Sequence, residues 1–210
     1  MHILGVTRHD SALKRQLRIP VNVSNNAMKQ ILNILTILLT FNSLLSGQND
    51  LREGVRKLKD ISDMPYICKG AINLSGCGQS AFWDIVMERD AAIPILLEFI
   101  DDTTNALATV PNFGGNWTVG DIAYSALEEI IDGIPTFKLL GVKYDSKGCG
   151  YCAYWFYLRE SPENRKAFKA NVVKWYNKNQ RKLIWVQSNQ TLTCDCRFNH
   201  PNGGHYELKH

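Results

Sequence analysis

Apolar residues recur at helical spacing along most of the chain, and short polar or glycine-rich segments separate these runs. Leu51, Val55, Leu58 and Ile61 lie on one face of a predicted amphipathic helix over residues 48–61. Similar apolar stripes predict further helices over residues 80–87, 91–102, 118–131, 135–140, 152–158 and 162–178. The pattern therefore indicates a mainly α protein.

Residues typical of helix ends support several of these boundaries. Thr118 and Asp121 have the spacing of a capping box, in which each side chain accepts a hydrogen bond from the other residue's backbone N–H. Ser161 followed by Pro162 is an N-cap with proline in the first turn. Gly133 is expected to end the helix that begins after Thr118.

The segments between the helices are predicted as loops or short strands. Residues 103–116 are polar and contain glycine, which indicates a loop. Residues 183–186 and 191–193 have the composition of two short strands and predict a hairpin, followed by a loop over 194–205. We therefore expect antiparallel helix pairs with a small cysteine-rich β-hairpin and loop appendage over residues 183–210.

The segment from Met28 has the organisation of a signal peptide. Lys29 precedes an apolar run over residues 31–45, and small residues follow up to Gly47. The run is too short for a confident membrane span, so no stable span is expected after cleavage. The alternatives are an uncleaved anchor, because Leu45 at the −3 position is unfavourable for a signal peptidase, and a buried N-terminal helix. We predict an upstream extension or mis-annotated start over 1–27, a signal peptide over 28–47 and a single helical domain over 48–210. A bacterial protein with this leader would be periplasmic or secreted.

The charge of the chain is concentrated before residue 48. The formal net charge is +4, and residues 1–47 account for all of it. The remaining chain is neutral overall, which argues against nucleic acid as a partner. Within it, residues 84–132 are strongly acidic and residues 138–182 strongly basic. We expect these two segments to pack together and complement each other, or to be solvated faces; a charged partner-binding surface is the alternative.

The segment Ile93–Ile131 resembles a HEAT-type helical pair. A helix with proline in its first turn, "IPILLEFIDD", leads through a loop into "VGDIAYSALEEI", which has small residues on its packing face. The resemblance extends over residues 80–131 if the preceding helix is included. It implies a helical stack that binds other proteins, because one pair cannot bury its own apolar face. An irregular α-domain is the alternative.

All six cysteines follow the signal segment, and an even number in an exported protein favours disulfides. Cys68 and Cys77 are expected to form a local bridge. The other four cysteines form a C-terminal group together with His200 and His205. They are Cys149, Cys152, Cys194 and Cys196.

This C-terminal group has four competing interpretations. The four cysteines form structural disulfides, or they hold a structural zinc ion as two closely spaced pairs. Alternatively, Cys149-Gly-Tyr-Cys152 resembles a thioredoxin-type redox motif, although the buried strand that precedes such a motif is missing. In the fourth, Cys149 or Cys152 is the nucleophile of a cysteine hydrolase with His200 or His205 as its base.

The sequence contains no other catalytic signature. The acidic pairs 101–102 and 128–129 are expected to be helix-end or solvated residues. We therefore expect a non-enzymatic, cofactor-free module that binds a protein partner, for example an immunity-type inhibitor of a delivered toxin. The alternative is a thiol-dependent enzyme that uses Cys149 or Cys152, with His205.

Overall fold

The computed structural model describes residues 29–30, 34, 47–64, 80–110, 113–143, 151–187 and 203–209. The chain divides into two units, Met1–Ser43 and Leu44–His210. In the first unit Lys29, Gln30 and Ile34 are helical and exposed. Within the described ranges, no helix is both long enough and apolar enough to cross a bilayer. The elements below belong to the second unit.

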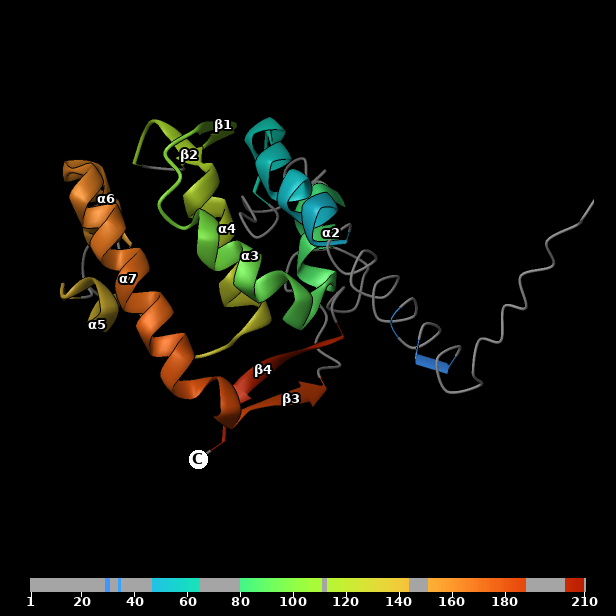
Figure 1. Ribbon diagram of the computed structural model, residues 1–210. Helices are drawn as coiled ribbons and strands as arrows, with labels where there is room; N and C mark the ends of the chain where they lie inside the picture. Colours follow the sequence, from blue (N-terminus) through green and yellow to red (C-terminus); the bar gives the residue numbers. More distant parts are fainter. Residues whose placement is uncertain are drawn as a thin grey trace, which may run out of the picture. The chain divides into compact units, whose positions relative to one another are not determined.

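The described residues between 47 and 99 are mainly helical, as the apolar spacing predicts (Figure 1). Residues 47–56 form a helix that tightens into the 3₁₀ turn η1, Lys57–Asp60. The next elements are α2 (Ser80–Met87), the short η2 (Arg89–Ala91) and α3 (Ala92–Phe99). Pro94 lies in the first turn of α3, where its missing N–H leaves no backbone hydrogen bond unmade.

Helix α4, Val119–Ile130, is the most buried helix of the described chain, with only Glu128 and Glu129 partly exposed. The predicted capping box is present, since Thr118 and Asp121 each accept a hydrogen bond from the other's backbone N–H. Gly120 donates its N–H to the Asp102 carbonyl at 3.0 Å. A Cβ atom at Gly120 would lie 2.5 Å from the Ile100 carbonyl oxygen, so only glycine permits this approach of α4 to the end of α3.

Three helices follow: α5 (Thr136–Leu140), α6 (Cys152–Glu160) and α7 (Pro162–Asn179), the last continuing into the 3₁₀ turn η3 (Gln180–Lys182). Ser161 caps α7 by accepting a hydrogen bond from the Asn164 N–H at 3.2 Å. Two aromatic residues of α6, Tyr154 and Trp155, are buried in the core as expected for an aromatic helix. In contrast, Phe156 is 67% exposed.

The segment predicted as a loop over 103–116 contains strand structure. Strand β1 (Asn105–Thr109) pairs antiparallel with β2 (Asn116–Thr118), and its residues alternate between exposed and buried. The prediction was wrong because the buried positions, Ala106 and Ala108, carry small side chains with little strand preference. The Asn116 side-chain amide, which donates to the Ala106 carbonyl at 2.6 Å, adds a contact between the two strands.

The C-terminal hairpin includes a strand that was not predicted. Strand β3 (Leu183–Gln187) pairs antiparallel with β4 (Gly204–Leu208), whose first two residues belong to the segment predicted as loop. The predicted strand over residues 191–193 lies outside the described residues. The strand β4 requires glycine at its first residue. A Cβ atom at Gly204 would lie 2.2 Å from the Val186 carbonyl oxygen.

Among the described residues, two ion pairs join the acidic and basic segments, as their complementary charges predict. Lys169 on α7 binds Asp101 after α3, with 2.7 Å between Nζ and Oδ1. Arg165 on α7 binds Asp121 on α4 at 3.0 Å, and both side chains are almost completely buried. Charge complementarity therefore helps to hold α7 against the first half of the domain.

Candidate functional site

Among the described residues, Cys152 is the only cysteine, and it is the first residue of α6. Its sulfur is disulfide-bonded. Its partner therefore lies outside the described residues, as do the other predicted site cysteines Cys68, Cys77, Cys149, Cys194 and Cys196. The pairing of the cysteines, and the zinc and thiol-enzyme interpretations of the C-terminal group, stay predictions.

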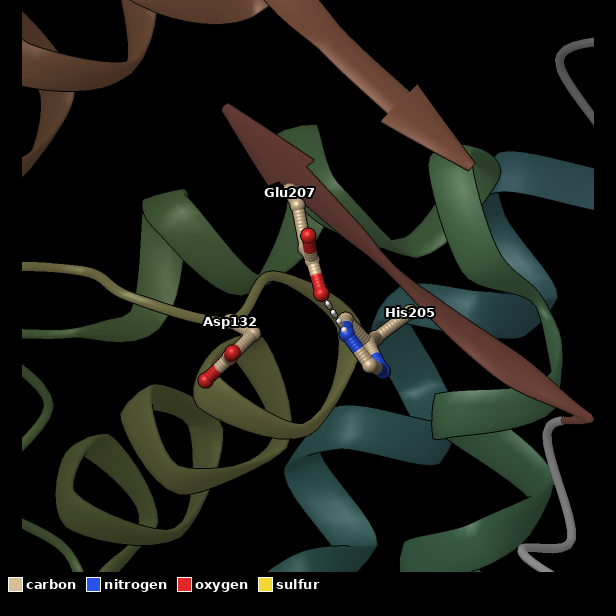
Figure 2. A group of neighbouring side chains, drawn as sticks. All are labelled: Asp132, His205 and Glu207. Carbon is tan, nitrogen blue, oxygen red and sulfur yellow. Dashed lines mark hydrogen bonds and ion pairs between the residues drawn. The ribbon is translucent and has the colours of Figure 1, made fainter. Parts of the chain in front are cut away.

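His205 lies on β4 in a group with Asp132 and Glu207 (Figure 2). One potential ligand atom from each of the three side chains lies within 4.8 Å of the others, and Cys152 is not part of the group. His205 Nε2 is 2.7 Å from Glu207 Oε1. Asp132 is exposed, while the other two side chains are partly buried. The structure thus brings His205 together with two carboxylates.

Backbone contacts position these three residues. Asp132 follows the end of α4 and donates its N–H to the Tyr206 carbonyl at 2.9 Å, and the preceding Ile131 forms a parallel bridge with Tyr206. His205 and Glu207 flank Tyr206, and alternate residues of a strand point to the same face. The end of α4 and one face of β4 are therefore fixed next to each other.

A pocket of about 520 Å³ lies beside this group, between the end of α4 and α5. Its polar wall consists of Glu128, Asp132, Thr136 and Lys138, and the aromatic rings of Phe137 and Tyr151 are also part of the lining. The two rings meet edge to face with their centres 5.2 Å apart. Asp132 belongs to both the pocket and the His205 group, so the two features are adjacent.

Glu128 has the most unusual environment in the pocket. Its Oε1 accepts a hydrogen bond from the Thr136 hydroxyl at 2.6 Å. Thr136 Oγ1 lies 2.8 Å from the Tyr124 hydroxyl, and because the Thr136 proton is used for Glu128, Tyr124 is the donor in this contact. Burial raises the pKa of Glu128 to about 7, against the lowering effect of these hydroxyl groups. Burial also raises the pKa of Tyr124.

The expectation that Glu128 is a helix-end or solvated acid does not fit this environment. Tyr124, Glu128 and Asp132 are four residues apart and so lie along one face of α4 and its end. The sequence shows that spacing. It does not predict that the Thr136 hydroxyl connects Glu128 to Tyr124, because this contact forms only when α5 folds back onto α4.

The buried pair of Asp121 and Arg165 is structural. Arg165 donates to Asp121 Oδ1 at 3.0 Å and to the Thr118 hydroxyl at 3.1 Å. Asp121 also accepts from the Thr118 backbone at 3.0 Å. These groups satisfy one another inside the core and do not line the pocket.

Comparison with models of protein families, with curated proteins and with solved structures finds no match for this chain.

Proposed function

We propose that the protein is an exported binding module whose pocket between α4 and α5 takes a positively charged side chain of a protein partner. The proposal rests on the position of the Glu128 carboxyl group in the pocket. This group lies in the wall of the pocket and accepts a hydrogen bond from the Thr136 hydroxyl, and no cation of the described residues pairs with it. A cationic side chain would supply the missing charge.

The electrostatics of Glu128 favour a cation as the occupant. Burial of an ionised carboxylate without a counter-charge is unfavourable, which is why its pKa is raised. An arginine or lysine that enters the pocket would form a charge-assisted hydrogen bond in a partly desolvated site, where such bonds are strongest. The partner's binding energy would thus include relief of an existing electrostatic penalty.

The shape and the other walls of the pocket fit a long basic side chain. Phe137 and Tyr151 offer aromatic surface for an alkyl stem or for the face of a guanidinium group. Asp132 adds a second acid, whereas Lys138 is the one base in the lining. In the described part of the chain Lys138 forms no ion pair with either acid. The lining therefore carries more negative than positive charge.

The scaffold and the compartment are part of the same proposal. We infer that α3–α4 is a HEAT-like helix pair or part of an irregular helical stack with a small cysteine-rich C-terminal hairpin. The leader sequence supports export to the periplasm or beyond, where an immunity-type inhibitor would neutralise a delivered toxin.

N-terminal sequencing of the exported protein should find a start at or near Gln48. A start that retains residues 1–27 would contradict export through this leader.

The pocket is tested with a small cation and its neutral isostere. We expect butylguanidinium to bind in the millimolar range, as befits a ligand of so few atoms, and butylurea to bind at least tenfold more weakly. NMR chemical shifts of the Glu128 side-chain carboxyl and the Thr136 amide report the binding. Because the ionised carboxylate is the binding form, the affinity should rise as the pH rises through about 7 and then level off.

Two variants test whether the cation binds to Glu128 in the pocket or to the neighbouring His205 group. Glu128→Gln keeps an acceptor for Thr136 and should abolish both the preference for the cation and the pH dependence. His205→Gln lies outside the lining and should leave both unchanged. Equal binding of the cation and of butylurea, or full binding by Glu128→Gln, would refute the proposal.

The thiol-dependent enzyme remains the alternative function. It requires Cys149 or Cys152 as a reactive thiolate, and the disulfide at Cys152 supports a structural role instead. If the cysteines are structural, replacement of Cys152 by Ser should lower the melting temperature. Rapid alkylation of the native, unreduced protein by iodoacetamide at about pH 6, with an unchanged melting temperature of the Ser variant, would favour the enzyme.

A further inference from the structure

The group formed by Asp132, His205 and Glu207 has the donor set of a metal site. It offers one imidazole nitrogen and two carboxylates, all within 4.8 Å of one another (Figure 2). Ligands bound to one tetrahedral metal ion at about 2.0–2.2 Å lie roughly 3.3–3.6 Å apart. His205 Nε2 and Glu207 Oε1 are hydrogen-bonded at 2.7 Å, so a shared metal ion would replace this hydrogen bond and move the two atoms slightly apart.

The group is held by backbone structure, which limits the reorganisation that metal binding would need. His205 and Glu207 share one face of β4, and β4 is paired with β3 along its whole length, from Gly204 to Leu208. Asp132 is joined to the intervening Tyr206 by a backbone hydrogen bond of 2.9 Å. The backbone positions of the three residues are therefore fixed relative to one another.

The charges of the group also favour a cation. Two carboxylates face a single imidazole, and no lysine or arginine of the described residues forms an ion pair with Asp132 or Glu207. The Asp132 carboxylate has no hydrogen-bond partner among the described side chains, and it is exposed to incoming ions. A divalent ion would neutralise this local negative charge.

We infer that Asp132, His205 and Glu207 bind a first-row divalent cation, with Zn²⁺ as the best match. Imidazole favours zinc and its neighbours over magnesium or calcium, and zinc accepts carboxylate ligands at similar distances. Three protein ligands would leave a coordination position for water or an external ligand. This site differs from the four-cysteine zinc site considered from the sequence, because none of its ligands is a thiolate.

The test uses untagged, full-length protein in its oxidised form. We expect a competition titration against a fluorescent zinc chelator to give one Zn²⁺ per chain. Asp132→Asn, His205→Gln and Glu207→Gln should each weaken binding at least tenfold, whereas His200→Gln, the same change in the same tail, should not. Because the Asp132 side chain is exposed, its variant should fold normally, and circular dichroism checks this for all variants.

Two further measurements distinguish the possible outcomes. The absorption spectrum with Co²⁺ should lack thiolate charge-transfer bands, and Glu128→Gln should retain zinc binding even if it loses the guanidinium preference. Absence of zinc binding, unchanged affinity in the three ligand variants, or a thiolate spectrum would each overturn the inference. None of these results would alter the test of the α4–α5 pocket with Glu128→Gln.

Discussion

Replacement of Arg165 by methionine tests the most buried ion pair of the described structure. The side chains of Arg165 and Asp121 are 5% and 0% exposed. Methionine fills similar volume but leaves the Asp121 carboxylate in the core without its cation. It also removes the hydrogen bond of 3.1 Å to the Thr118 hydroxyl, which caps α4. The variant should therefore loosen the contact between α7 and the start of α4.

Removal of one partner of a buried ion pair typically destabilises a protein by about 3–5 kcal/mol. For a domain of this size, that loss corresponds to a decrease of about 6–20 °C in melting temperature. Urea unfolding followed by tryptophan fluorescence measures the change in the free energy of unfolding. The matched control is Arg52→Met, since Arg52 also pairs with a carboxylate, Glu98, at 2.7 Å but near the surface. The control should lose clearly less stability.

A double variant checks the physical reason. Asp121→Asn keeps an acceptor for the Thr118 backbone but leaves Arg165 as the unpaired charge. If the two charges depend on each other, the combination with Arg165→Met should be less destabilised than the sum of the single variants. Additive losses, or a loss for Arg165→Met no larger than for Arg52→Met, would show that the pair does not hold α7 against α4.

Three further predictions concern separate parts of the molecule. Gly120→Ala should destabilise the protein by about 1–3 kcal/mol, because its methyl group would meet the Ile100 and Asp102 carbonyls at 2.5 and 2.7 Å. The control is Gly54→Ala in the first helix, where the nearest new contact is 3.9 Å away, and this variant should be slightly more stable than the wild type. Similar thermal shifts in the two variants would contradict this reasoning. Since the folded-state pKa of Glu128 is raised from 4.5 to about 7, the folded protein keeps a proton that the unfolded chain releases, so the free energy of unfolding should fall by at most about 3 kcal/mol as the pH rises through this interval. Glu128→Gln should lack this decrease in urea titrations at several pH values, and parallel profiles of variant and wild type would refute the assignment. Cys68 and Cys77 should form a bridge that adds about 2–3 kcal/mol, and recovery of both as free thiols in non-reducing peptide mapping would exclude it.

The amino-acid sequence by itself determined the main helices, because their signals are local. The apolar spacing of residues 48–61 predicted the first helix, and Thr118 with Asp121 predicted the capping box at the start of α4. Ser161 and Pro162 predicted the start of α7 in the same way. Each of these signals depends on residues within one or two helical turns, so it can be recognised without knowledge of the rest of the fold.

Tertiary structure alone decided the strand pairing and the candidate sites. The first two residues of β4 fall in the segment predicted as loop, and Gly204 is needed there for close contact with β3, not for a turn. The pKa of Glu128 depends on burial beside α5, and Asp132 meets His205 only because β4 binds the end of α4. These contacts join segments distant in sequence, and no local pattern specifies which segments will meet.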